Sequence, residues 1–217
     1  MKKSLILLSI ISLFVISSPD RAHSGAREQI MLPKPAMTGG MPLMNALAKR
    51  QSSRSFTDRA LSDQVLSNLL WAADGVNRTD SGKRTAPSAM NKQEIDIYAA
   101  LAEGLYRYDA KKHALELVLD RDIRAQTGQQ DFVAGAALNL VYVADLSAAA
   151  GADREEKVLY AAADTGFIGQ NVYLFCASEG LATVIRGYID RKALGKAMKL
   201  KSGQMIILAQ TVGHPGK

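Results

Sequence analysis

Residues 153–178 read DREEKVLYAAADTGFIGQNVYLFCAS, and this stretch predicts a long helix at the centre of the fold. Asp153 is a good N-cap, and Glu156 follows three residues later at the spacing of a capping box. Beyond this start the helix is apolar almost all round. Small residues recur along it: Ala161, Ala162, Ala163, Gly166 and Gly169. We therefore expect either a fully buried central helix or a helix at a subunit interface.

The segments around this helix predict further helices and strands. Ser62 as N-cap, apolar residues at helical spacing and Gly75 beyond the end predict one helix, and shorter helices are expected at 42–50 and 190–198. Alternating or β-branched apolar runs predict strands at 94–100, 105–109, 114–119, 138–144 and 205–212. Helices come first, a strand meander follows and one strand closes the chain. This order indicates an α+β fold rather than a doubly wound sheet.

Two segments lack a periodic pattern. Residues 25–41 are rich in Gly, Pro and Met, so we interpret them as an N-terminal arm rather than a packed element, suited to wrapping a partner subunit. Residues 74–90 are polar and contain Gly75, Gly82 and Pro87, which predicts a long loop. Long ordered loops in compact domains are commonly functional.

The first residues have the pattern of a secretory signal peptide. Lys2 and Lys3 precede an apolar run at 5–16, which is shorter than the about 20 residues of a membrane span. Ala22 and Ser24 predict cleavage near Ser24, and an uncleaved N-terminal anchor is the alternative. The expected organisation is a signal peptide at 1–24, an arm at 25–41 and one domain at 42–217. We expect an exported protein, periplasmic or secreted, without a stable membrane span after cleavage.

Charge and cysteine content narrow the function classes. The formal charge of +6 falls to +4 in the mature chain, because Lys2, Lys3, Arg21 and Asp20 are removed with the signal peptide. This modest charge is not clustered on one element, so we expect no nucleic-acid partner. Cys176 is the sole cysteine and cannot form an internal disulfide. It lies within an apolar helix, so we interpret it as a core residue.

Several common site motifs are missing from the sequence. There is no Gly-x-Gly-x-x-Gly turn after a strand and no Walker loop, so neither a dinucleotide-binding turn nor a phosphate loop is indicated. The spacing leaves a Ser–His–Asp triad open, but there is no Gly-x-Ser-x-Gly elbow to support it. The mature chain keeps His113 and His214, and neither has a Cys or carboxylate at metal-ligand spacing. We interpret both as turn or surface residues and expect no metal site.

Three separated segments carry candidate binding residues. Residues 50–56, RQSSRSF, place guanidinium groups on both sides of hydroxyl groups, which suits a phosphate monoester; a solvated helix end is the alternative. Residues 87–93, PSAMNKQ, are small or amide-bearing and would alone pass as a turn. In residues 180–190, GLATVIRGYID, Arg186 and Gly187 interrupt an apolar stretch where the backbone can approach a flat ligand.

Together these segments resemble the nitroreductase family of FMN-dependent oxidoreductases. The resemblance covers about residues 42–215 and also includes LLWAADGVNR and the ending VGHP. It implies a nitroreductase-like fold with a central, mainly antiparallel sheet flanked by helices. It further implies an intertwined homodimer with two FMN sites at the subunit interface, which the small-residue helix and the N-terminal arm suit.

The resemblance also implies cofactor-binding residues in the first two segments. Arg50 and Arg54 are expected at the FMN phosphate and the pyrimidine end of the ring, with Gln51 and Ser52 beside them. Cations near that edge of the ring stabilise its reduced, anionic form. The loop that the other subunit brings to the flavin is expected to include Pro87, Ser88, Ala89 and Asn91.

Further along the chain, Gln129 falls about where the family has an amide near the ring. The backbone of Arg186 and Gly187 is expected near flavin N5, where it tunes hydride acceptance. Members commonly continue past VGHP with a basic residue at the phosphate, whereas this chain ends at Lys217. We expect Lys217 to substitute, or Arg50 and Arg54 to hold the phosphate almost unaided.

The implied function is ping-pong transfer through flavin N5. A small-molecule donor reduces the flavin, which then passes electrons to a nitro, quinone or similar acceptor, and no protein nucleophile is needed. Two alternatives stay open. One is a flavin-dependent dehydrogenase or oxidase resembling the azoline oxidases, and the other is a flavin-binding dimer without turnover.

Overall fold

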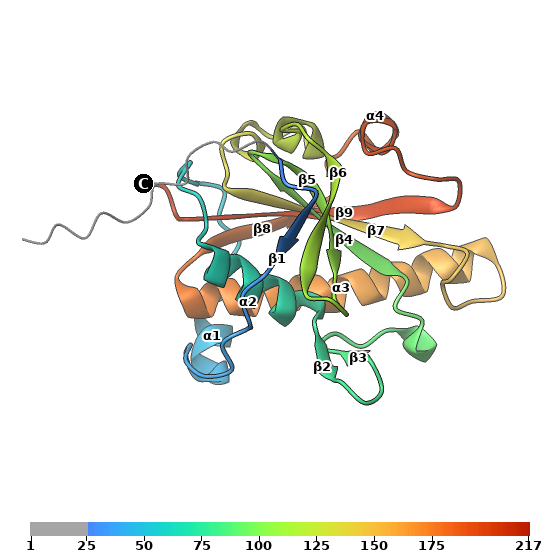
Figure 1. The fold of residues 1–217 in the computed structure, drawn as a ribbon, viewed down its shortest axis with the longest axis horizontal. Coiled ribbons are helices and arrows are strands. Elements are labelled where there is room, and N and C mark those ends of the chain that lie inside the picture. Colours follow the sequence, from blue (N-terminus) through green and yellow to red (C-terminus); the bar gives the residue numbers. More distant parts are fainter. Residues whose placement is uncertain (1–25) are drawn as a thin grey trace, which may run out of the picture.

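The structure is a computed structural model that describes residues 26–217, so the predicted signal peptide lies outside the described residues. Its centre is a seven-stranded sheet in the order β1-β6-β5-β4-β7-β9-β8 (Figure 1). All neighbouring strands are antiparallel. The predicted α+β class with an antiparallel sheet is confirmed. None of the helices in residues 26–217 is both long and apolar enough to span a membrane.

The strands of this sheet span Gln29–Met31 (β1), Ile95–Leu101 (β4), Gly104–Asp109 (β5), Ala114–Leu119 (β6), Leu138–Asp145 (β7), Ala182–Arg186 (β8) and Gln204–Gly213 (β9). A separate hairpin consists of Val76–Arg78 (β2) and Lys83–Arg84 (β3). The α-helices span Leu43–Lys49 (α1), Asp63–Asp74 (α2), Arg154–Glu179 (α3) and Arg191–Ala197 (α4). Short 3-10 turns span Ala89–Asn91 (η1), Arg124–Thr127 (η2) and Asp131–Val133 (η3).

Three parts of the fold differ from the sequence prediction. Within the predicted arm at 25–41, strand β1 pairs with β6, so the arm is tied to the sheet edge and is not free of packed structure. The predicted loop at 74–90 contains the β2–β3 hairpin, which turns near Gly82 at φ 63°. Strand β8 was not predicted. It forms the opposite edge of the sheet and pairs only with β9 among the described strands.

Helix α3 begins and ends at the residues that the sequence indicates. The Asp153 side chain accepts the N–H of Glu156 at 2.9 Å, and the Glu156 carboxylate accepts the N–H of Ala152 at 2.8 Å. Gly180 ends the helix in the left-handed conformation, with φ 69°. In Figure 1, α3 crosses one face of the sheet and α4 lies over the other.

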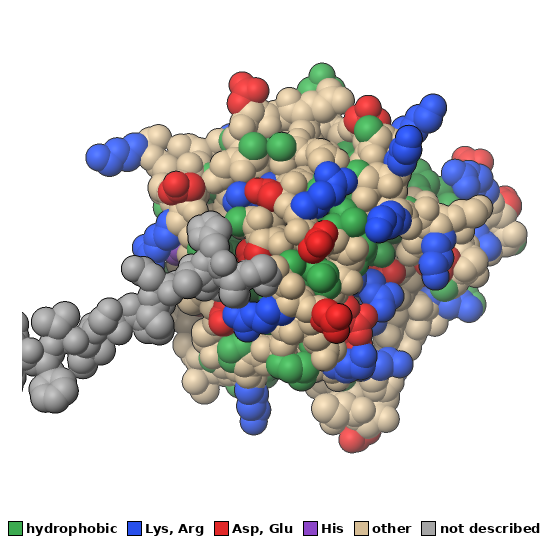
Figure 2. Space-filling model, turned by 45° about the horizontal axis from the view of Figure 1, so that its top comes forward, with side chains coloured by type: hydrophobic (Ala, Val, Ile, Leu, Met, Phe, Trp, Pro, Cys, Tyr) green, Lys and Arg blue, Asp and Glu red, His purple; other side chains and the backbone are tan. Residues whose placement is uncertain are grey.

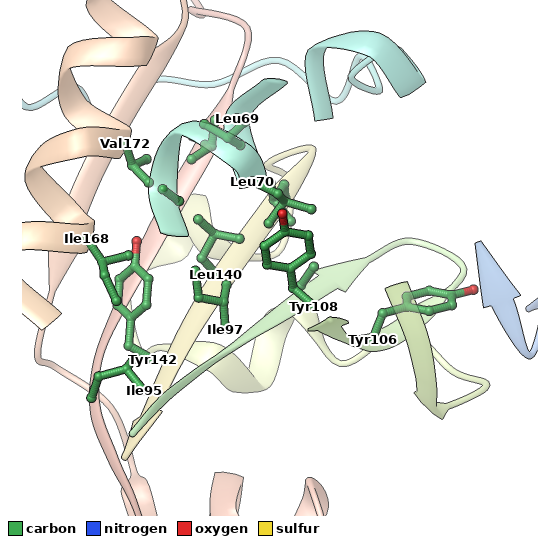
Figure 3. Close-up of a cluster of buried hydrophobic side chains, with 14 of the residues drawn as sticks. Leu69, Leu70, Ile95, Ile97, Tyr106, Tyr108, Leu140, Tyr142, Ile168 and Val172 are labelled. Carbon is green, nitrogen blue, oxygen red and sulfur yellow. The ribbon is translucent and has the colours of Figure 1, made fainter. Parts of the chain in front are cut away.

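One side of α3 and the apolar side of α2 form the main core with the sheet. These buried side chains come from elements far apart in the sequence, so the core fixes α2 and α3 against the central strands. The residues that meet in this layer include Leu69, Leu70, Ile97, Leu140, Tyr142, Ile168 and Val172 (Figure 3).

The other side of α3 is not covered by the described chain. Leu159, Tyr160 and Phe167 are 65%, 41% and 48% exposed. A fully buried helix, one of the two sequence expectations, is therefore excluded within this chain. Contiguous exposed apolar residues on a helix are typical of an interaction surface.

Three buried carboxyl groups lie where α2, β4 and α3 meet. Asp74 ends α2, Glu94 precedes β4 and Asp164 lies within α3. Arg84 of the hairpin forms an ion pair with Asp74. Burial nevertheless raises the pKa of Asp74 from 3.8 to about 7, against the lowering effect of Arg84. Burial also raises the pKa of Glu94.

Gly180→Ala should destabilise the protein by about 1 kcal/mol, because a side chain disfavours left-handed backbone. A Cβ at this position would meet no atom within 4 Å, so the loss would be conformational and not steric. The matched control is Gly195→Ala within α4, which should be neutral or stabilising by up to about 1 kcal/mol. Denaturant unfolding checks both variants, and equal losses would contradict this account of the α3 terminus.

Asp74→Asn should flatten the dependence of stability on pH. Because the folded-state pKa of Asp74 is raised, the folded state binds more protons than the unfolded state between about pH 4 and pH 7. Its contribution to the free energy of unfolding therefore falls as pH rises through that window. Urea unfolding across the window measures the slope, and the exposed control Asp58→Asn should keep the wild-type slope. An Asp74→Asn variant with the wild-type slope would contradict a raised pKa of Asp74 as the source of this pH dependence.

Candidate functional site

The first predicted segment lines a hollow between α1, α3 and β8. Residues 50–53 leave α1 and run beside β8, where the N–H of Ser53 donates to the Thr183 carbonyl at 2.9 Å. The hollow has a volume of about 620 Å³, and Arg50 and Gln51 form part of its wall. Strand β8 pairs with β9 on one side, and the Thr183 carbonyl that accepts from Ser53 lies on the other side. This other side is the edge of the sheet, where backbone groups can form further hydrogen bonds.

Tyr173 of α3 ties this segment to the sheet, and sequence reasoning missed it. Its hydroxyl accepts the N–H of Ile185 at 2.9 Å and lies 2.8 Å from Ser52 Oγ. The Arg50 guanidinium carbon lies 5.3 Å from the centre of the Tyr173 ring, within cation–π range. One tyrosine thus positions α3, β8 and the predicted binding segment. Within an apolar helix a tyrosine gives no sequence signal beyond that of a core residue.

The end of the chain lies beside the same segment. The N–H of Thr57 donates to the His214 carbonyl at 2.9 Å, and the N–H of Gly216 donates to the Ser55 carbonyl at 3.0 Å. The exposed Arg54 precedes this pairing. The structure therefore brings together RQSSRSF and VGHP, two of the motifs that carry the family resemblance.

Gln129, Arg186 and Gly187 meet at the other end of β8. The N–H of Gln129 donates to the carbonyl of Tyr188 at 3.2 Å, which fixes the residues after η2 beside the end of the strand. Gly187 is exposed, whereas the Arg186 side chain is buried. Burial lowers the pKa of Arg186 to about 10, so its guanidinium stays charged at neutral pH.

The second predicted segment is held at a different place on α3. The N–H of Ala89 donates to Asp164 Oδ2 at 2.8 Å, and the N–H of Gln93 donates to Ser88 Oγ at 2.9 Å. Pro87 precedes this turn, and Asn91 within it is exposed. Asp164 is nine residues from Tyr173, which corresponds to about 14 Å along a helix.

A single protomer therefore anchors the first and second segments at separate points of α3. That the second segment serves the site of another subunit stays a prediction. The predicted third segment, in contrast, lies along the same strand edge as the first.

The two histidines and Cys176 occupy structural positions. His113 Nδ1 lies 2.9 Å from the Tyr108 hydroxyl, and its Nε2 lies 2.8 Å from Ser67 Oγ, which donates to the Pro33 carbonyl. His113 thus links the N-terminal arm to α2 and the β5–β6 turn. Cys176 is buried and forms no disulfide. Residues 26–217 contain no group of three or more His, Cys, Asp or Glu that could hold a metal.

A second hollow of about 450 Å³ lies under the arm, between α1, α2 and α3. Met37, Trp71 and Phe175 are among its lining residues, and none of the predicted binding residues reaches it. On the face in Figure 2, basic and acidic side chains are interspersed, so charge does not single out another site on that face. The edge of β8 is therefore the place where the candidate residues of the first and third segments, together with Gln129, converge.

Comparisons with known proteins find relatives that are named as candidate nitroreductases. One relative is a candidate nitroreductase of Methanocaldococcus jannaschii. It is 28% identical over 176 residues, which cover 76% of this chain and 88% of that protein. The crystal structure of a candidate nitroreductase from Ralstonia eutropha is 44% identical, with a TM-score of 0.84, over 88% of this chain and 91% of that one.

A further solved structure shares the fold at lower identity. A candidate nitroreductase from Desulfovibrio desulfuricans, solved in complex with FMN, is 24% identical with a TM-score of 0.59, over 82% of this chain and 88% of that one. The profile of the nitroreductase family matches residues 47–214, from α1 to the closing strand. Since this match covers most of the sequence, the chain belongs to the nitroreductase family.

Proposed function

We propose that this chain is an FMN-dependent oxidoreductase of nitroreductase type, which passes electrons from a small-molecule donor to a nitro, quinone or similar acceptor. The observation that carries the proposal is the meeting of residues 50–57 and 213–217 beside the open edge of β8. Family membership supports it, as does the FMN-bound relative described above.

The residues along this edge fit the chemistry of FMN. Arg50 and Arg54 provide guanidinium groups for a phosphate, and Gln51 and Ser52 provide donors for a polyol chain. The hollow of about 620 Å³ lies within the usual size range of ligand pockets. At the other end of β8, the exposed backbone of Gly187 is accessible to a flat ring.

In this proposal the protein binds and orients, and bound FMN supplies the redox chemistry of its ring. Tyr173 holds Ser52 and the Ile185 backbone in fixed positions, so the binding edge is organised before the ligand arrives. Gln129 is held beside Gly187 and can present its amide to the ring. No side chain has to act as a nucleophile.

We propose further that two chains form a homodimer through the exposed side of α3. Leu159, Tyr160 and Phe167 would be buried there, and the segment at 87–93 would then reach the partner's site. Its position near Asp164, away from Tyr173, supports this assignment. Burial of such apolar surface is the main driving force of stable dimers.

We also propose that the mature protein is exported, on the basis of the signal-peptide pattern in residues 1–24. Reduced nicotinamides of the cytoplasm are not supplied outside the membrane. The physiological donor of an exported protein would then be another small molecule.

Arg50→Ala and Arg54→Ala should each weaken FMN binding at least about tenfold, because each removes a charged donor from the phosphate. Flavin fluorescence titration of the mature protein measures the dissociation constants. Arg59→Ala, which removes an exposed arginine outside the segment, is the matched control and should bind like the wild type. Unchanged affinity in both variants would refute the roles assigned to Arg50 and Arg54.

Phe167→Glu should convert the dimer to monomers and reduce FMN binding with it, because a charge would be buried in the apolar contact. Sedimentation velocity gives the oligomeric state, and circular dichroism checks that the variant is folded. The control is Met31→Glu, which places the same charge at an exposed apolar residue of the edge strand β1 and should leave the dimer intact. A folded, dimeric Phe167→Glu protein would rule out this interface.

A further inference from the structure

Arg186 is a buried cation without an acidic partner. Arg186 is 6% exposed. Its guanidinium donates to Thr127, Asn139 and Thr211. The distances are 2.5 Å to the Thr127 carbonyl, 3.1 Å to Thr127 Oγ1, 2.7 Å to Asn139 Oδ1 and 2.9 Å to Thr211 Oγ1. All of these acceptors are neutral. Among residues 26–217, no carboxylate forms a hydrogen bond or ion pair with Arg186.

The surroundings are built to hold the guanidinium in one place. Gly128 leaves room for the guanidinium, because a Cβ at position 128 would overlap Arg186 Nη1. Thr211 Oγ1 also donates to Asn139 Oδ1 at 2.7 Å, and Asn139 Nδ2 donates to the Val133 carbonyl at 2.8 Å. Hydrogen bonds to neutral groups satisfy the geometry of the cation but do not neutralise its charge. A buried, uncompensated charge is energetically costly, and an anion nearby would relieve that cost.

The position of this charge relates it to the proposed flavin site. Arg186 is directly followed by Gly187, which is exposed at the end of the open edge of β8. Buried charges are screened much less by water and salt than exposed ones. The field of Arg186 therefore extends to a ligand beside Gly187, although the side chain itself is enclosed by protein.

Reduction changes the charge of the flavin ring. A donor that transfers a hydride loses two electrons and one proton, which the neutral oxidised ring takes up together, and the ring gains one negative charge. The charge of the FMN phosphate is the same before and after. A fixed cation near the ring thus favours the reduced form over the oxidised form.

We propose that Arg186 is a positioning residue with an electrostatic role: a built-in counter-charge that stabilises the reduced, anionic flavin ring without contacting it. This inference rests on the proposed FMN site. It assigns to Arg186 a function that its hydrogen bonds alone do not require, because a neutral side chain could also tie η2 to β8.

The test compares the affinity for oxidised and reduced FMN in Arg186→Met, which removes the charge. We expect the preference for reduced over oxidised FMN to fall about tenfold, which for a two-electron couple lowers the midpoint potential by about 30 mV. Reduction with dithionite in the presence of a reference dye measures the potential. Arg186→Lys keeps the charge and should retain most of the preference.

Two further variants keep the proposal testable if Arg186→Met does not fold. Asn139→Asp places a carboxylate next to Nη2 as an internal counter-ion, so the preference for reduced FMN should fall. Thr211→Val removes a neutral acceptor of Nε and should leave the preference unchanged. If Arg186→Met and Asn139→Asp alter oxidised and reduced binding by equal factors, Arg186 is structural only and the proposal is overturned. If the wild type binds no FMN, the proposed function fails, which is a different result.

Discussion

The rest of the structure depends on the two-sided packing of helix α3. One side is held by the sheet and α2, and the other side carries equally apolar residues that no part of the described chain covers. A helix that is apolar on both sides leaves apolar surface exposed to solvent in a single chain. Because α3 also carries Tyr173 and Asp164, the helix with the proposed dimer surface also positions the two segments with candidate binding residues.

The second constraint is the open edge of β8. A sheet edge offers unpaired backbone groups, and here part of that edge is used by Ser53 and Tyr173. These contacts bring the arginines of the first segment to one end of the strand. At the other end, the Arg186 guanidinium donates to Thr127, and the N–H of Gln129 donates to the carbonyl of Tyr188, which follows Gly187. The two ends differ in how their cations are placed: in the proposed site, exposed cations would bind the phosphate and a buried cation would act on the ring through its field.

Much of this arrangement could be predicted from the sequence. The capping residues Asp153 and Ser62 and the terminal Gly75 mark the helices correctly, because caps are local signals. Strand β1 and the β2–β3 hairpin were missed because they are short and depend on pairing with distant partners. Tyr173 was missed for a similar reason: its hydroxyl gains a role only when Ser52 and Ile185 are folded against it. The buried state of Arg186 likewise follows from tertiary contacts alone.

In the proposed site, each FMN contacts residues of two chains, so FMN binding would depend on dimer formation. The most direct measurement is sedimentation velocity of the mature protein with added FMN, followed at the visible absorption of the flavin, for the wild type and for a variant that cannot dimerise. We expect the visible absorption of the flavin to sediment with the wild-type dimer and to be absent from the sedimenting monomer of the variant. Full FMN binding by a folded monomer, or a dimer that takes up no FMN, would contradict it.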